Sequence, residues 1–166
     1  MVANAFTSGT PGRTTPRARW NARIISSVPA GSRPARGDYD GDGSIEKAAY
    51  DPATGQWVTA GARGTFSYAA PPDIDADAST SVYPVPHDYD GDGDTDAAFY
   101  RDADATWHIE GQTPIHFGRS TAETPTFAGT PVHDIPVPGD YDGDGDTDLA
   151  TYRPDTGEHH IAGQAP

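Results

Sequence analysis

The sequence predicts an all-β protein built from three consecutive repeats of short antiparallel strands. Three observations lead to this fold class. A stretch of 25 residues occurs three times, each copy contains strand-type residues separated by turn signals, and no segment shows the period of an amphipathic helix. The 19 Gly and 16 Pro among 166 residues, with aromatic residues at repeated positions, fit a turn-rich β domain better than a disordered chain.

The three copies align without a gap and begin at residues 37, 87 and 139. They read GDYDGDGSIEKAAYDPATGQWVTAG, HDYDGDGDTDAAFYRDADATWHIEG and GDYDGDGDTDLATYRPDTGEHHIAG. A spacing of about 50 residues suits a blade-sized unit of about four strands. We therefore divide the chain into a basic N-terminal arm at 1–36, repeat 1 at 37–86, repeat 2 at 87–138 and a truncated repeat 3 at 139–166.

Each repeat is expected to contain the same elements in the same order. A Pro-rich approach, at 84–86 and 136–138, leads into an Asp-rich loop. The strand after this loop is expected at 47–50, 97–100 and 149–152, and after a turn the next strand is expected at 56–60, 106–110 and 158–162. Further strands are expected at 63–68 and 113–118, and the segments 69–82 and 119–134 are expected to be loops or weak edge strands.

The N-terminal arm differs in charge from the rest of the chain. It contains no acidic residue and six arginines, which are Arg13, Arg17, Arg19, Arg23, Arg33 and Arg36. Two interpretations stay open. Residues 2–6 could supply the strand that the truncated repeat 3 lacks, or the arm could be a solvated terminus. In an assembly, its arginines could also dock on an acidic neighbour.

Composition excludes several classes of function. All 25 Asp and Glu lie outside the arm and the net charge is −14, so free nucleic acid is not an expected partner of the main body. There is no cysteine, which excludes disulfides and thiolate metal sites. No stretch has the length and apolarity of a membrane span or of the core of a signal peptide.

Three loops of the pattern D-x-D-x-D-G-x-x-D/E carry the chemistry. They are loop one (38–46), loop two (88–96) and loop three (140–148). Carboxylates at alternate positions of a tightly turned loop point at one centre, and Ca²⁺ takes six to eight oxygens at about 2.3–2.6 Å. The glycine at position 6 permits the positive φ that curls the chain around the ion. Position 7 is expected to offer its backbone carbonyl.

This pattern predicts about three Ca²⁺ ions per chain. The predicted carboxylate ligands are Asp38, Asp40, Asp42 and Glu46 in loop one, Asp88, Asp90, Asp92 and Asp96 in loop two, and Asp140, Asp142, Asp144 and Asp148 in loop three. Position 7 is occupied by Ser44, Asp94 and Asp146. Because loop one ends in Glu46 and has a serine at position 7, we expect its affinity to differ. Zinc would require His or Cys, and magnesium takes fewer protein ligands.

The segment PVPGDYDGDGDTDLATYRPDTG (136–157) resembles the VCBS/FG-GAP repeat, and segments 84–101 and 37–50 resemble it more weakly. The resemblance covers somewhat under half of the chain. It implies β-propeller-type blades of four antiparallel strands, with calcium bound in the loop of a hairpin. Family propellers typically have about seven blades, whereas this chain has three repeats, and repeat 1 has Arg33-Pro34-Ala35-Arg36 in place of the Pro-Val-Pro approach. Completion by N-terminal strand exchange or by oligomerisation is therefore expected.

The predicted function is that of a non-catalytic, calcium-binding module, secreted or on the cell surface, that binds a protein or glycan. The alternative is a structural assembly component of the virion-decoration or surface-layer type, built by head-to-tail association into a homo-oligomer. The expected location is extracellular or the cell surface, with a virion as the alternative. Trp57 and Trp107 could be sugar platforms, but packing between repeats is the favoured interpretation. No local motif assembles a catalytic set, so an enzyme is not expected.

Overall fold

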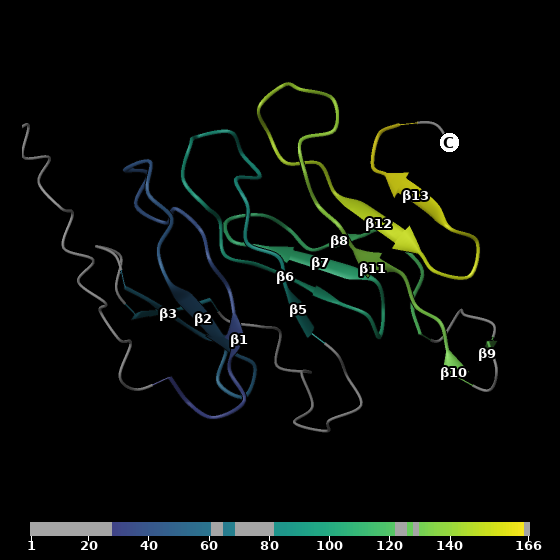
Figure 1. Cartoon of the computed structure of the whole chain (residues 1–166), viewed down its shortest axis with the longest axis horizontal. Helices are drawn as coiled ribbons and strands as arrows, with labels where there is room; N and C mark the ends of the chain where they lie inside the picture. Colours follow the sequence, from purple (N-terminus) through teal and green to yellow (C-terminus); the bar gives the residue numbers. More distant parts are fainter. Residues whose placement is uncertain (1–27, 61–64, 69–81, 122–125, 128–129, 165–166) are drawn as a thin grey trace, which may run out of the picture.

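The computed structural model describes residues 28–60, 65–68, 82–121, 126–127 and 130–164. The described residues contain strands, turns and bends and no helix, which confirms the all-β class. Three antiparallel sheets follow one another along the long axis of the molecule (Figure 1). No helix in the described part of the chain is long and apolar enough to cross a membrane.

Sheets one and two have four strands each, and sheet three has three. Sheet one consists of β1 (Arg33–Pro34), β2 (Ala48–Asp51), β3 (Gln56–Thr59) and β4 (Thr65–Ser67). Sheet two consists of β5 (Val82–Pro84), β6 (Ala98–Arg101), β7 (Thr106–Ile109) and β8 (Ile115–His116). Sheet three consists of β11 (Ile135–Pro136), β12 (Ala150–Arg153) and β13 (Glu158–Ile161). A separate two-stranded ribbon is formed by β9 (Thr126–Phe127) and β10 (Thr130–Pro131).

The strands of each sheet are arranged in chain order, so every connection joins neighbours. The strands after each loop lie within one residue of their predicted positions, and β4 and β8 lie inside the predicted segments 63–68 and 113–118. Segment 119–134, expected to be loop or weak edge strand, contains the short ribbon of β9 and β10.

The first strand of each sheet was not predicted as a strand, because its sequence is rich in proline. These strands, β1, β5 and β11, each end in a proline. Proline cannot donate to the strand ladder and is tolerated where the strand lies at a sheet edge. All three occupy such an edge, so the Pro-rich approach pairs with the strand on the far side of the Asp-rich loop.

Sheets one and two share a core of aromatic residues. Tyr39, Tyr50 and Trp57 of the first sheet region are almost fully buried with Ala97 and Phe99 of the second. The Tyr50 and Phe99 rings are stacked, with centroids 6.0 Å apart. Offset ring pairs of this kind add about 0.5–1.5 kcal/mol beyond the area they bury. The apolar core therefore lies between repeats and joins them.

The second core joins sheets two and three in the same way. It contains Tyr89, Tyr100 and Trp107 from sheet two and its loop, and Leu149 from the start of sheet three. Trp57 and Trp107 are both 0 % exposed, so packing between repeats is confirmed and neither ring is available as a sugar platform.

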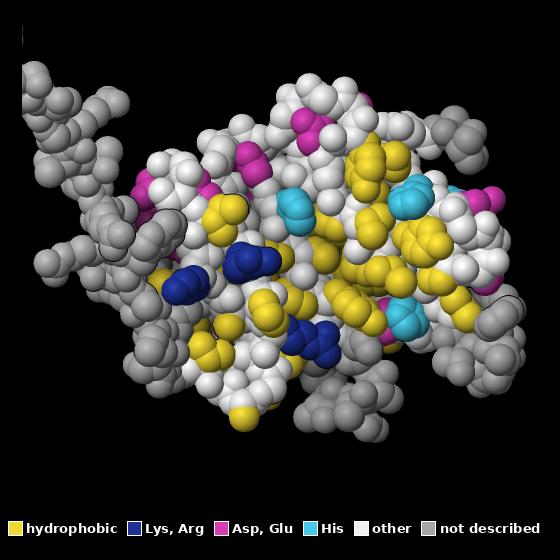
Figure 2. Space-filling view, viewed as in Figure 1, with side chains coloured by type: hydrophobic (Ala, Val, Ile, Leu, Met, Phe, Trp, Pro, Cys, Tyr) yellow, Lys and Arg dark blue, Asp and Glu magenta, His cyan; other side chains and the backbone are white. Residues whose placement is uncertain are grey.

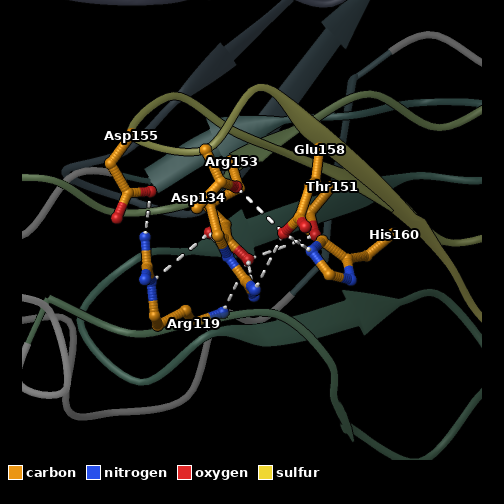
Figure 3. A network of polar contacts seen from close by, with 8 residues as sticks. Arg119, Asp134, Thr151, Arg153, Asp155, Glu158 and His160 are labelled. Atoms are coloured by element: carbon orange, nitrogen blue, oxygen red, sulfur yellow. Dashed lines mark hydrogen bonds and ion pairs between the residues drawn. The ribbon is translucent and has the colours of Figure 1, made fainter. Parts of the chain in front are cut away.

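A buried ion network adds to the junction of sheets two and three (Figure 3). The carboxylate of Asp134 is completely buried and accepts two hydrogen bonds from the Arg153 guanidinium, at 3.1 Å each. It also accepts the Thr151 hydroxyl at 3.3 Å and the backbone N–H of Arg119 at 3.0 Å. The Arg119 side chain reaches Asp155 in the turn between β12 and β13. Because Arg119 follows β8 and Asp134 precedes β11, this network ties the end of sheet two to sheet three.

Among the described residues, the three sheets do not close into a barrel or ring, so the β-propeller arrangement stays a prediction. The expected strand at residues 2–6 lies outside the described residues, as do most of segments 1–36 and 69–82. Sheet three lacks, within the described part, a counterpart of the fourth strands β4 and β8.

Candidate metal centres

Each Asp-rich loop connects the first two strands of its sheet, where it brings carboxylates together. An isolated bridge closes each loop at its base, between Gly37 and Glu46, His87 and Asp96, and Gly139 and Asp148. In each loop at least three carboxylates offer oxygens that lie within 4.8 Å of one another. The groups are Asp38, Asp40, Asp42 and Glu46 in loop one, Asp88, Asp90 and Asp96 in loop two, and Asp140, Asp142 and Asp148 in loop three.

The backbone of each loop holds the carboxylate at position 1. In loop two, Asp88 accepts the N–H of Gly91 at 2.7 Å on one oxygen and the N–H of Gly93 at 2.9 Å on the other. The carboxylate of Asp96 accepts the N–H of Tyr89 at 2.9 Å. A carboxylate has about four lone-pair sites, so these bonds fix the orientation of each group and leave sites for a cation.

Loops one and three repeat this pattern. Asp38 accepts the N–H of Gly43 at 2.8 Å, and Asp140 accepts the N–H of Gly145 at 3.3 Å. Glycine is required here by the backbone, since the position-6 glycines have φ of 86°, 96° and 104° in loops one to three. The glycines at position 4 also have positive φ, from 66° to 82°. This second requirement was not part of the sequence-based prediction, although the repeated G-x-G contained it.

Two predicted ligands lie outside the groups of neighbouring oxygens. These are Asp92 and Asp144, at position 5 of loops two and three. Each accepts a backbone N–H at 3.0 Å, from Asp94 and Asp146 respectively. The hydrogen bond from Asp94 N–H lowers the pKa of Asp92, so its carboxylate is held in the charged form. Asp92 and Asp144 therefore stabilise the turn of their loops in this structure. In loop one, Asp42 accepts the corresponding backbone N–H and also belongs to the carboxylate cluster.

A tyrosine at position 2 bonds every loop to the residue that directly follows the first strand of its sheet. The hydroxyls of Tyr39, Tyr89 and Tyr141 donate to the backbone carbonyl four residues earlier, at 2.6, 2.7 and 2.7 Å. The sequence contains this signal as the repeated D-Y-D, but the spacing of the acids alone does not reveal the contact. The tyrosine positions the loop from outside the carboxylate group.

The electrostatics of the loops favour a bound cation. Burial raises the pKa of Asp96, and the charges of Asp90, Asp92 and Asp88 raise it further, against the opposing hydrogen bond from Tyr89. Carboxylates this close disfavour one another's charged form unless a cation compensates them. Acidic side chains are visible where the three loops lie, at the left and upper edge of the molecule, and others are visible at its right-hand end (Figures 1 and 2).

The donor set of these groups fits a hard divalent cation. All grouped atoms are carboxylate oxygens, without histidine or cysteine, among the described residues. Two oxygens on opposite sides of a Ca²⁺ ion are about 4.6–5.2 Å apart, so a separation within 4.8 Å is compatible with shared ligation. Each of the three loops could thus hold a metal ion.

No family model, curated protein or solved structure matches this chain. The resemblance to the VCBS/FG-GAP repeat therefore stays a prediction carried by the motif residues alone.

Neighbouring loops are hydrogen-bonded to each other, which the sequence did not reveal. Thr95, at position 8 of loop two, donates its N–H to the carbonyl of Asp38 at 2.6 Å and accepts the Asp38 N–H on its hydroxyl at 2.9 Å. Thr147, at position 8 of loop three, donates its N–H to the carbonyl of Asp88 at 2.9 Å. The corresponding residue of loop one is Ile45, which is 75 % exposed. Position 8 therefore joins each loop to the one before it.

Proposed function

We propose that this protein is a non-catalytic, calcium-binding β-repeat protein in which calcium serves a structural role. The observation that carries the proposal is that a cluster of at least three carboxylates recurs at the same place in all three sheets. Hard oxygen ligands in a flexible loop suit Ca²⁺, whereas Mg²⁺ demands a stricter octahedral shell and keeps several waters. Zn²⁺ prefers nitrogen and sulfur ligands.

A structural role follows from where the loops lie. Each loop connects two strands of a sheet and also bonds to the neighbouring loop, so an ion in the loop would stabilise both the sheet and the junction between repeats. Without cations, the excess of 25 acidic over 11 basic side chains would favour expansion of the chain. Calcium bound only by the folded state stabilises that state by mass action.

Titration calorimetry tests the proposal directly. Calcium added to metal-free protein should bind to about three sites, and magnesium at the same concentration should compete weakly. Extracellular modules bind calcium with Kd of about 10⁻⁴–10⁻³ M, so the titration should extend to about 10 mM. Absence of calcium binding over this range would refute the proposal.

The wider role that we propose is a binding module, secreted or at the cell surface, whose ligand is a protein or a glycan. The acidic composition and exposed oxygen-rich loops suit a compartment with abundant calcium. A calcium affinity near the millimolar range would support this location, whereas a submicromolar affinity would favour an intracellular sensor or buffer. Binding of calcium-loaded protein to a glycan array or to cell-surface proteins would identify the ligand.

The second candidate is a structural assembly component, as in a virion coat or a surface layer. One observation favours it: Tyr141 is 45 % exposed, whereas Tyr39 and Tyr89, at the same position, are 2 % and 8 % exposed because the next repeat covers them. Hydrophobic side chains are also visible over the C-terminal sheet (Figure 2). Head-to-tail association with a second copy would cover this surface. Light scattering with calcium should then detect oligomers that chelation dissociates, and a monomer at every concentration would contradict this candidate.

A further inference from the structure

The peptide groups 94–95 of loop two and 146–147 of loop three each donate a hydrogen bond to the preceding loop. The N–H of Thr147 donates to the carbonyl of Asp88, and the carbonyl of the same peptide group is that of Asp146. The N–H of Thr95 donates likewise to the carbonyl of Asp38, and its peptide carbonyl is that of Asp94. Asp94 and Asp146 are the position-7 residues whose carbonyls are the expected metal ligands of loops two and three.

The planarity of the peptide bond connects the two ends of each group. In a trans peptide the N–H and C=O lie in one plane and point in opposite directions, so fixing one fixes the other. The side-chain carboxylate of Asp88 belongs to the carboxylate cluster of loop two. The backbone carbonyl of Asp88 accepts the hydrogen bond from the Thr147 N–H. An ion that orders Asp88 in loop two would thereby fix the direction of the Asp146 carbonyl, the expected ligand of loop three.

The side chain of Asp146 also faces loop two. A Cβ atom placed on Gly91 would lie 2.0 Å from Oδ1 of Asp146, so this carboxylate lies directly against the backbone of loop two. Asp88 and Asp90 of loop two are among the charges that surround Asp146. An ion bound in loop two would offset this repulsion and favour the arrangement of loop three seen here.

We infer that the three loops bind their cations cooperatively, with the peptide groups 94–95 and 146–147 transmitting occupancy between neighbouring loops. The inference rests on the proposed calcium function. Coupling runs between nearest neighbours, so loop two interacts with both others. The peptide group 44–45 of loop one has no preceding loop among the described residues, and Ile45 is exposed. Coupling is reciprocal: an ion in loop three strengthens loop two by the same factor by which loop two strengthens loop three.

A calcium titration of ¹⁵N-labelled full-length protein by NMR tests the coupling. The amides of Gly43, Gly93 and Gly145 each donate to the position-1 carboxylate of a different loop, so each reports one site. Asp142→Asn removes a charge from loop three but keeps an oxygen to accept the Asp144 N–H. This substitution should raise the calcium concentration at which the Gly145 amide signal is half-shifted. Through coupling, it should also raise the corresponding midpoint of the Gly93 amide, by about 5-fold or more.

Three comparisons decide the result. The matched control Glu158→Gln removes one negative charge from the same repeat, outside the loop, and should leave Gly93 unchanged. The reciprocal variant Asp90→Asn should raise the midpoint at Gly145 by a factor similar to that measured at Gly93 for Asp142→Asn. At about 1 M salt the Debye length is about 3 Å, so coupling through the peptide groups should persist while general charge repulsion is screened.

The failures of the two proposals are distinguishable. If the wild-type glycine amides shift with calcium but Asp142→Asn leaves Gly93 unmoved, the loops are independent and the coupling is refuted while calcium binding stands. If the effect at Gly93 disappears at high salt, it reflects long-range charge alone, and the peptide link is refuted. If no loop amide of the wild-type protein responds to calcium, the proposed function itself fails, and the coupling with it.

Discussion

A single methyl group can test whether the loops hold the repeats together. Gly37 and Gly139 occupy the same position in repeats 1 and 3, and neither has a positive φ. A Cβ on Gly37 would lie 2.4 Å from Cγ2 of Thr95, whereas a Cβ on Gly139 would meet only the Tyr141 ring, at 3.4 Å or more. Gly37→Ala therefore introduces a collision with the next repeat, and Gly139→Ala is its matched control.

The loss of stability in Gly37→Ala depends on how far the Thr95 side chain can move away from the added methyl group. Thr95 is 9 % exposed and β-branched, so its side chain has little freedom to rotate away. Overpacking of this kind costs about 1–3 kcal/mol, and loss of the hydrogen bond from Asp38 N–H to the Thr95 hydroxyl adds about 1 kcal/mol. Both alanines reduce the entropy of the unfolded chain by the same amount, which cancels in the comparison. We expect Gly37→Ala to be less stable than Gly139→Ala by about 2–4 kcal/mol.

Urea unfolding at fixed calcium, followed by tryptophan fluorescence, measures this difference, because Trp57 and Trp107 lie in the two junction cores. For a domain of this size, the difference corresponds to about 4–16 °C in Tm. Equal stability of the two variants would refute the packing of loop two against loop one, and with it the contact between repeats.

Three further predictions concern charged and titrating groups. Asp134→Ala should lower the free energy of unfolding by about 3 kcal/mol, because it removes the buried carboxylate that accepts two hydrogen bonds from the half-buried Arg153, whereas Asp155→Ala on the surface should cost much less, both measured by urea unfolding. Burial, with the nearby charge of Arg101, lowers the pKa of His108. The unfolded chain then takes up the proton first, so stability should fall as the pH drops below about 6.5, and His108→Phe should flatten this fall in unfolding curves recorded from about pH 7 to pH 5. Calorimetry should show that Asp90→Ala removes the calcium site of loop two or weakens it by about 10-fold or more, whereas Ser44→Ala, which retains the backbone carbonyl, should have little effect.

The fold class and the strands that follow the loops could be predicted because they depend on local sequence. Turn residues and alternating apolar residues recur in each repeat, and β6 and β7 lie within one residue of the predicted strands. The edge strands β1, β5 and β11 could not be predicted by the same rules, because a terminal proline argues against a strand until its place at the edge of the sheet is known. Edge position is a property of the whole sheet.

The carboxylate groups could be predicted from the loop pattern, but the contacts between loops could not. The acids of each loop lie within nine residues of one another, so local geometry brings them together. Thr95 and Asp38, by contrast, are 57 residues apart and meet only because the repeats stack. The buried Asp134 was also missed, because Val82 and Ser32 occupy the corresponding position in the other repeats and no repeated pattern marks it.

Calcium in the three loops should stabilise the fold, and thermal unfolding with and without a chelator measures this stabilisation. At a calcium concentration about 100 times Kd, each site should contribute about 2.7 kcal/mol before any coupling between sites is counted, so Tm should rise by many degrees when calcium replaces the chelator. Magnesium at equal concentration should restore only a small part of this shift. An unchanged Tm after complete chelation would contradict a stabilising role of calcium in the loops.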